Sequence, residues 1–511
     1  MTNDSISPNG ARCPNILYIE SDQHNPNISG CYGEETVRTP NLDALAARGT
    51  VLTNAYCASP ICVPSRMSLL TGQYPYENEV WCNTQILNSA IPTYAHAMGA
   101  AGYRPVQIGR LHFVGSDQLH GFAERYVGDH SPNHMGSPHP VDHGALEGTA
   151  GPQRVALEKS GYGQSAYEVH DEYVAAATVD YINRLGIRKR SGFEVEPFSL
   201  SVGMMLPHQP FVARKEDYDE YVGKVPMPRI REPYSDNLHP YFQWWRSRTG
   251  IEDVTDEEIM RCRTAYWALV TRTDALIGEM LDALRQNGFE NDTLVIYTTD
   301  HGEQVGEHDL WWKQTFYEDS ARVPAIVSWP AGLPQGGVCD RVINQFDLNA
   351  TMLDAIGAPP LPRSHGRSLI GLLNDPDGTS WEDVAFSEFV MYAQRDGLPF
   401  DVHSPPDGSV QRMIRYEEWK LNYYHGMRPQ LFNLAEDPQE LNDLAEDPAY
   451  ASIRDELVGR VLDGWDPDEV TRKMAMAQRD EQVMREWAET VDPPDTYRWD
   501  LHPDMDYVDG P

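Results

Sequence analysis

The sequence predicts an α/β protein whose main domain contains a large, mostly parallel central sheet flanked by helices. Short apolar runs that suit buried strands begin at Asn15, Tyr103, Pro197, Thr293 and Pro324. Segments with apolar residues at helical spacing lie between or beside these runs, at residues 93–101, 167–184 and 256–286. Strands that alternate with helices are typical of a parallel sheet covered on both faces, where ligands bind beyond the carboxyl ends of the strands.

Two of the predicted strands end in clustered polar residues. The run "NILYIES" from Asn15 leads into Asp22 and Gln23, and "TLVIYTT" from Thr293 leads into Asp300 and His301. The carboxyl ends of parallel strands meet at one edge of a sheet, so we expect these four side chains to lie together. Carboxylate, amide and imidazole groups at one point predict a site for a divalent cation.

Basic side chains are expected at the same edge of the sheet. His112 in "GRLHFVG" and His208 in "LPHQPF" each come shortly after a predicted strand. Three further cationic residues belong to the same set: Arg66, Arg110 and Lys313. A basic pocket beside a metal ion suits a tetrahedral oxyanion, so the sequence predicts an anionic substrate or ligand.

The stretch "SPICVPSRMSLLTG" predicts a short helix with a cysteine at its start. Pro64 suits the first position of a helix, and Gly72 is a typical residue for its end. Cys62 is therefore expected at a helix N-terminus, where free backbone N–H groups and the helix dipole favour an anion. Arg66 lies one turn further along the same helix.

The chain of 511 residues is long enough for more than one domain. We predict a catalytic domain over residues 1–375 and a smaller α+β domain over 376–473, in which alternating residues at 384–391 and 412–424 indicate an antiparallel sheet. Residues 474–511 are polar and read as an arm that docks on this chain or on a neighbour. We expect the arm to be exchanged between subunits, so we expect the protein to be a homo-oligomer.

Composition and charge exclude several classes of partner. The formal net charge is −36, from 77 acidic and 41 basic residues, which argues against nucleic acid and anionic membranes as partners. The sequence has no apolar run of about 18 residues, so no membrane span is expected. The first 15 residues are polar and do not resemble a signal peptide, which favours a cytoplasmic location. Seven scattered cysteines do not suggest a disulfide scaffold.

Five sequence blocks resemble one enzyme family. "CVPSRMSLLTG" from Cys62 is similar to the Cys-X-Pro-Ser-Arg signature of type I, formylglycine-dependent sulfatases, which belong to the alkaline-phosphatase-like superfamily. "YGEETVRTPNLDALAARG", "GRLH", "TDHGEQVGEH" and the block with Lys313 look like other family blocks in the same order. The resemblance spans most of residues 15–330 and, weakly, the segment "LFNLAEDPQELNDLA". It implies the alkaline-phosphatase-like fold.

The resemblance also implies why a cysteine stands at position 62. In this family a formylglycine-generating enzyme converts the cysteine to an aldehyde, whose hydrated form attacks sulfur. The second hydroxyl of the hydrate then allows sulfate to leave, which a thiolate would not allow. Cys62 is therefore expected to become formylglycine, and the modifying enzyme is an expected partner.

The roles of the site residues follow from the same resemblance. The implied metal ligands are Asp22, Gln23, Asp300, His301 and the oxygen of modified Cys62. The implied catalytic residues are Cys62, Arg66, His112, His208 and Lys313. Arg66 would hold the formylglycine, Lys313 and His208 would act at the leaving oxygen, and His112 would be the base that releases sulfate. Asn83 and Arg110 match substrate-binding positions, although most family members have lysine where this chain has Arg110.

The predicted metal ligands do not identify the substrate. Asp22-Gln23 and Asp300-His301 resemble phosphonate monoester hydrolases and choline sulfatases more than many arylsulfatases. An imidazole ligand favours Mn²⁺ over Ca²⁺ without deciding between them. We expect a sulfatase that acts on a small aryl or alkyl sulfate monoester. The alternatives are a phosphonate monoester or phosphodiester hydrolase, and a non-catalytic oxyanion-binding protein that keeps Cys62 as a thiol. The sequence does not identify the alcohol part of the substrate.

Overall fold

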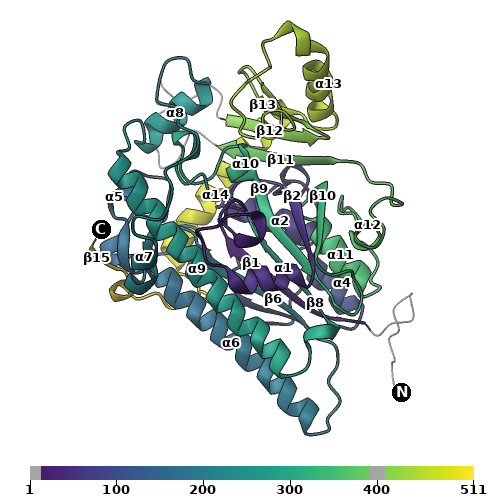
Figure 1. Ribbon diagram of the computed structural model, residues 1–511. Helices are drawn as coiled ribbons and strands as arrows, with labels where there is room; N and C mark the ends of the chain where they lie inside the picture. Colours follow the sequence, from purple (N-terminus) through teal and green to yellow (C-terminus); the bar gives the residue numbers. More distant parts are fainter. Residues whose placement is uncertain (1–12, 392–408, 511) are drawn as a thin grey trace.

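The computed structural model describes residues 13–391 and 409–510, and it confirms the predicted α/β architecture (Figure 1). The central sheet has eight strands in the order β10-β2-β9-β8-β1-β6-β3-β4. Their bounds are β1 Asn15–Asp22, β2 Thr50–Tyr56, β3 Pro105–Gly109, β4 Glu124–Tyr126, β6 Ser199–Pro207, β8 Thr293–Thr299, β9 Arg322–Ser328 and β10 Gly337–Asn344. Only β9 runs antiparallel to its neighbours in this sheet. The expectation for residues 1–15 falls mostly outside the described residues.

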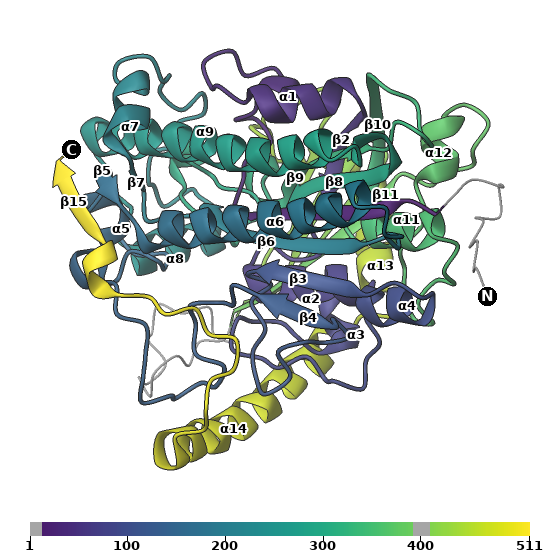
Figure 2. The same cartoon turned by 90° about the horizontal axis from the view of Figure 1, so that it is seen from below.

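Helices cover both faces of the central sheet (Figures 1 and 2). On one face lie α1 (Pro40–Ala47), α6 (Ala166–Arg190) and α9 (Asp256–Gln286); on the other lie α2 (Cys62–Thr71), α4 (Tyr94–Ala100) and α11 (Asp347–Ala355). Successive residues of a strand point to opposite faces, so Leu17 and Ile19 enter one hydrophobic core while Ile16 and Tyr18 enter the other. Burial on both faces explains the continuous apolar runs in the sequence.

Three strands of this sheet were not predicted: β4, which is only three residues long, and the pair β2 and β10. β2 carries Thr53 and Asn54 at half-buried positions, and β10 forms the edge of the sheet, with Val338 and Asp340 exposed. Neither strand is a continuous apolar run, because each is only partly covered. The apolar pattern that identifies the central strands is therefore weak at this side of the sheet.

A separate antiparallel sheet forms the smaller C-terminal unit, as predicted (Figure 1). Its strands are β11 (Val384–Met391), β12 (Ser409–Tyr416), β13 (Trp419–Tyr424) and β14 (Gln430–Asn433). The helix α13 (Ala451–Leu462) packs on it, and Leu457 and Val461 join Leu421 and Leu431 in a core of its own.

The C-terminal segment contains a long helix before the arm begins. α14 (Pro467–Val491) starts at an Asp466 cap and continues past residue 474, where we expected the polar arm to start. Residues 492–510 then lie along this same chain (Figure 2). The strand β15 (Tyr507–Gly510) pairs with β5 (Gly161–Gln164), and the Trp499 N–H donates to the Asp129 carbonyl at 2.8 Å.

The described residues bear on two expectations from the sequence, one about membrane spans and one about disulfides. Within residues 13–391 and 409–510, none of the helices combines the length and the apolar character needed to cross a bilayer. All seven cysteines lie in this described part, and none of them forms a disulfide there.

Candidate active site

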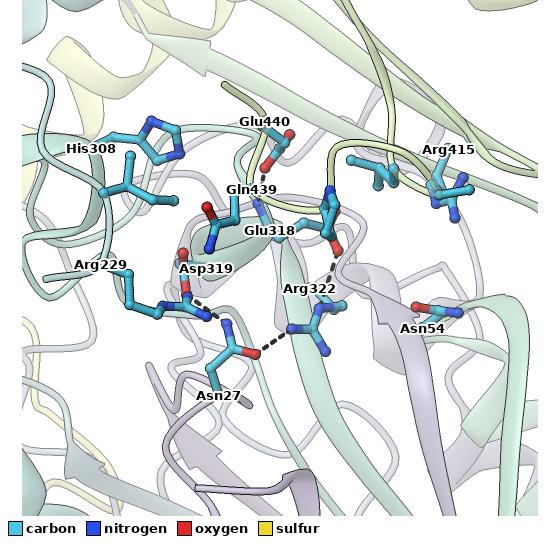
Figure 3. Close-up of a pocket in the computed structure, with 14 residues that line it drawn as sticks. Asn27, Asn54, Arg229, His308, Glu318, Asp319, Arg322, Arg415, Gln439 and Glu440 are labelled. Carbon is cyan, nitrogen blue, oxygen red and sulfur yellow. Dashed lines mark hydrogen bonds and ion pairs between the residues drawn. The ribbon is translucent and has the colours of Figure 1, made fainter. Parts of the chain in front are cut away.

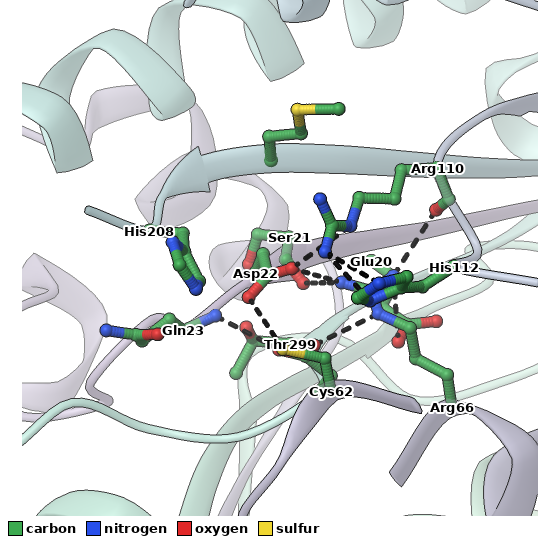
Figure 4. Close-up of polar contacts among 12 residues, drawn as sticks. Glu20, Ser21, Asp22, Gln23, Cys62, Arg66, Arg110, His112, His208 and Thr299 are labelled. Carbon is green, nitrogen blue, oxygen red and sulfur yellow. Dashed lines mark hydrogen bonds and ion pairs between the residues drawn. The ribbon is translucent and has the colours of Figure 1, made fainter. Parts of the chain in front are cut away.

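The carboxyl ends of β1 and β8 bring the predicted metal-binding residues together. Figure 4 shows three of them, Asp22, Gln23 and Cys62. The two strands are parallel neighbours with Ser21 opposite Thr299, so Asp22 and Asp300 emerge side by side. The Gln23 N–H donates to Oδ1 of Asp300 at 3.0 Å. Ligand atoms of Asp22, Cys62, Asp300 and His301 all lie within 4.8 Å of one another, and the four residues are buried.

Cys62 lies at the N-terminus of α2, as the sequence predicted, but the helix begins at Cys62 itself and not at Pro64. The helix has no side-chain cap at Ile61, but the Val63 N–H donates to Oδ1 of Asn83 at 3.0 Å, and Gly72 ends the helix in the left-handed conformation. The Cys62 sulfur lies 3.3 Å from Nε2 of His301 and 3.9 Å from Oδ1 of Asp22. The positive end of the helix therefore points at the proposed nucleophile position.

Lys313 connects three of the predicted residues. Its ammonium group donates to Oε1 of Gln23 at 2.8 Å, to Nε2 of His208 at 2.9 Å and to the Cys62 sulfur at 3.0 Å, which uses all three of its donors. His208 follows the end of β6, where Pro207 is paired with Asp22. Its Nδ1 lies 2.5 Å from the Gln209 carbonyl, so Nε2 is the ring nitrogen that accepts from Lys313. Burial and the Lys313 charge lower the pKa of His208.

Arg66 is enclosed by three carboxylates. Its guanidinium lies 3.0 Å from Asp300, 3.0 Å from Asp22 and 3.3 Å from Glu20, and all four side chains are almost fully buried. Burial opposes ionisation of Asp22, but the basic side chains around it, including Arg66, hold its pKa well below the usual range. Burial raises the pKa of Glu20 to about 7, with Arg66 acting in the opposite direction.

Arg110 and His112 form the other side of the cluster. Arg110 donates to Nδ1 of His112 at 2.8 Å, and its Nε lies 3.6 Å from Asp22. Burial, followed by the Arg110 charge, lowers the pKa of His112 well below its ordinary value, so the imidazole is neutral. Gly203 allows this arrangement, because a Cβ there would lie 1.6 Å from the Arg110 carbonyl.

Four residues in or beside this cluster have a left-handed backbone although they are not glycine. Gln23 has a φ of 66° and His112 has a φ of 57°, and the two neighbours of Lys313, Trp312 and Gln314, have φ values of 65° and 74°. Residues other than glycine rarely adopt this region, so the surrounding structure must hold these four in place.

The donor set at the strand ends fits a divalent cation. Two buried carboxylates, Asp22 and Asp300, supply hard oxygen donors that converge with the Cys62 sulfur and the His301 imidazole. Burial lowers the pKa of His301 to about 4, so its imidazole is neutral and able to ligate. Gln23 reaches this group through Lys313, which binds its amide oxygen.

The structure joins ten of the eleven predicted site residues through side-chain contacts. The exception is Asn83, which contacts the backbone of Val63 rather than another predicted side chain. Sequence reasoning missed five buried residues in or next to the cluster: Glu20, Asp129, His130, Tyr167 and Glu303. Glu20 did carry a signal, since it is an acidic residue inside an apolar strand. Glu303 stands in the block "TDHGEQVGEH", three residues after Asp300, whereas the other three stand in segments whose pattern does not predict contact with the site.

A cavity of about 410 Å³ lies apart from this cluster, at the junction with the C-terminal unit (Figure 3). None of the eleven predicted residues, all within the described part of the chain, lines it. Charged groups of its lining pair with one another: Arg322 lies 3.1 Å from Glu318, and Arg229 lies 3.9 Å from Asp319. The chemistry therefore places the candidate site at Cys62 rather than in this cavity.

Comparison with known proteins agrees with the geometry. The family model described as Sulfatase matches residues 14–358, and the model described as N-sulphoglucosamine sulphohydrolase, C-terminal, matches residues 306–464. A choline-sulfatase from Rhizobium meliloti (strain 1021) is 32% identical over 457 residues, which cover 85% of this chain and 83% of that protein. Arylsulfatase K from Homo sapiens is 28% identical over 453 residues, which cover 85% of this chain and 79% of that protein.

A solved structure shows the same fold. The phosphonate monoester hydrolase of Agrobacterium radiobacter matches with a TM-score of 0.72 at 24% identity, over 88% of this chain and 95% of that one. At this level of identity the likeness establishes the architecture and leaves the substrate open.

Proposed function

Because the chain belongs to the sulfatase family, we propose that it hydrolyses a small aryl or alkyl sulfate monoester at the cluster around Cys62. The observation that carries the proposal is the position of Lys313, whose ammonium group lies 3.0 Å from the Cys62 sulfur and 2.9 Å from His208. A proton donor and a neutral imidazole thus stand together beside the proposed nucleophile.

Two groups that the structure does not contain complete the proposal. A divalent cation, Mn²⁺ or Ca²⁺, held by Asp22, Asp300 and His301 would withdraw charge from the transferring group, and formylglycine at position 62 would supply a hydroxyl nucleophile that can later release sulfate. A formylglycine-generating enzyme is the proposed partner for that modification. We also propose Gln23 as a further ligand.

The protein's own side chains would position the ester and move protons. Arg66 faces the nucleophile position and contacts the carboxylates of Asp22 and Asp300. It would therefore hold the nucleophile and these two proposed metal ligands in position. Lys313 lies where the leaving oxygen of an ester held against residue 62 would be stabilised, and His208 can exchange a proton with it. His112 is the neutral base on the opposite side of the cluster, and Arg110 and Asn83 would orient the anion.

The metal-binding set also supports a second candidate, a phosphonate monoester or phosphodiester hydrolase. A His301 ligand next to Asp300 is the feature that favours it, and these substrates are singly charged tetrahedral anions like sulfate monoesters. Matched 4-nitrophenyl sulfate and 4-nitrophenyl phenylphosphonate decide between the two. We expect the larger kcat/KM for the sulfate, with choline sulfate tested next because a relative is a choline-sulfatase. A larger kcat/KM for the phosphonate would reverse the order.

We further propose a cytoplasmic homo-oligomer in which residues 492–510 exchange between subunits. The arm lies on its own chain through β15 and Trp499, and the same contacts can form between two copies. A chain ended at residue 491 should lose its native size in solution. Retention of that size would contradict the exchange.

A further inference from the structure

Two buried carboxylates beside the site have no role in the proposed mechanism. Glu20 is fully buried and Asp129 is 4% exposed. Each faces one arginine of the cluster: Glu20 lies 3.3 Å from Nη1 of Arg66, and Asp129 lies 3.8 Å from Nε of Arg110. Neither belongs to the group of side chains that converges on the cation position.

The oxygen that faces the arginine is in each case the oxygen without a hydrogen bond. Oε1 of Glu20 and Oδ2 of Asp129 are buried and accept no hydrogen bond from any described residue. The second oxygen is anchored instead: Oε2 of Glu20 accepts from the Tyr18 hydroxyl at 2.8 Å, and Oδ1 of Asp129 accepts from the Ser131 N–H at 3.2 Å. Each carboxylate is therefore fixed in place by one oxygen and presents the other to a guanidinium as a charge.

In this arrangement, one pair of carboxylates would balance the charge of a bound cation and a second pair balances the charges of the two arginines. Asp22 and Asp300 also contact Arg66, but a bound cation would take up their negative charge. Glu20 then remains as the carboxylate that neutralises Arg66, and Asp129 does the same for Arg110. The imidazoles of His112 and His130 do not add positive charge, since burial holds the pKa of both below its ordinary value.

We propose that Glu20 and Asp129 determine the charge selectivity of this site, by favouring singly charged esters over doubly charged phosphate monoesters. The inference rests on the proposed function and adds a reason for its substrate class. An arginine whose charge is neutralised attracts an anion weakly, whereas a bare guanidinium in a dry pocket attracts a dianion about twice as strongly as a monoanion. Loss of either carboxylate would thus favour dianions.

The test compares two anions of the same shape that the protein cannot hydrolyse. Benzenesulfonate carries one negative charge, and phenylphosphonate carries two at mildly alkaline pH. Calorimetry with Mn²⁺-loaded protein gives the ratio of the two dissociation constants for the native chain, for Glu20→Gln and for Asp129→Asn. We expect each variant to shift the ratio about tenfold towards phenylphosphonate. The same shift should appear in kcat/KM for 4-nitrophenyl phosphate relative to 4-nitrophenyl sulfate.

Two control variants separate charge from structure. Glu168→Gln removes a buried carboxylate that pairs with Arg272 at 3.1 Å and touches none of the site residues, so it should keep the native ratio. Glu20→Asp retains the charge and should restore most of the selectivity that Glu20→Gln loses. If Glu20→Gln does not fold, Asp129→Asn carries the test alone.

The outcomes are distinct. An unchanged ratio in both charge-removing variants, or an equal weakening of both anions, overturns the inference and leaves Glu20 and Asp129 as structural residues. Failure of the native protein to hydrolyse any ester refutes the proposed function instead. The binding ratio does not depend on turnover, so it still measures the charge effect in that case.

Discussion

Replacing Cys62 by alanine is expected to lower kcat/KM for 4-nitrophenyl sulfate by at least about 10⁴-fold while the fold is retained. Cys62 begins α2, where alanine is well tolerated, and the helix keeps its Asn83 contact and its Gly72 end. The variant therefore removes the nucleophile without removing the packing around it. Steady-state kinetics and circular dichroism, measured on protein from the native host, check the two parts of this prediction.

Cys57→Ala is the matched control for that experiment. Cys57 is a fully buried thiol five positions earlier, and it is not part of the group that converges with Asp22 and His301. This variant should keep most of the native activity. If Cys62→Ala retained more than about a tenth of the activity, covalent catalysis at this position would be excluded.

Replacing Arg66 by alanine is expected to cost about 3–5 kcal/mol of unfolding free energy, in addition to the loss of activity. The guanidinium lies within 3.3 Å of Glu20, Asp22 and Asp300, and its removal leaves three buried carboxylates without their common cation. Urea unfolding of the native and variant chains measures the difference. Mn²⁺ should recover part of the loss, because a cation on Asp22 and Asp300 replaces some of the missing positive charge.

An exposed arginine provides the comparison. Arg104 pairs with Glu124 across the surface, with its side chain 68% exposed, so Arg104→Ala should change the unfolding free energy by less than about 1 kcal/mol. A similarly small loss for Arg66→Ala, or one that Mn²⁺ leaves unchanged, would contradict the central electrostatic role given to Arg66.

The sequence predicted most of the central sheet because its strands are buried on both faces. The runs that became β1, β6 and β8 are continuous and apolar, and the polar residues that end them mark the carboxyl edge of the sheet. Their side-by-side placement follows from parallel pairing alone. The prediction missed β2 and β10, where partial exposure allows polar residues into the strands, and the three-residue strand β4.

Other parts of the site depend on contacts that local patterns do not contain. Asp129 reaches Arg110 from a loop about twenty residues away, and the arm residue Trp499 holds that loop through its backbone. The helix α14 was also hidden, because its polar face is large and most of its residues contact solvent. Glu20 is different, since an acidic residue inside a buried strand is visible in sequence and indicates a buried partner such as Arg66.

The most direct test of the whole account is the mass of the tryptic peptide of residues 49–66, from native-host protein treated with iodoacetamide. This peptide contains both Cys57 and Cys62, so Cys57 serves as an internal thiol control. If Cys62 is converted to formylglycine, the peptide carries one alkylated thiol, at Cys57. Residue 62 is then lighter than cysteine by about 18 Da, as conversion of the thiol to an aldehyde requires. Alkylation at both positions would show that Cys62 remains a thiol and would contradict the proposed hydrolase.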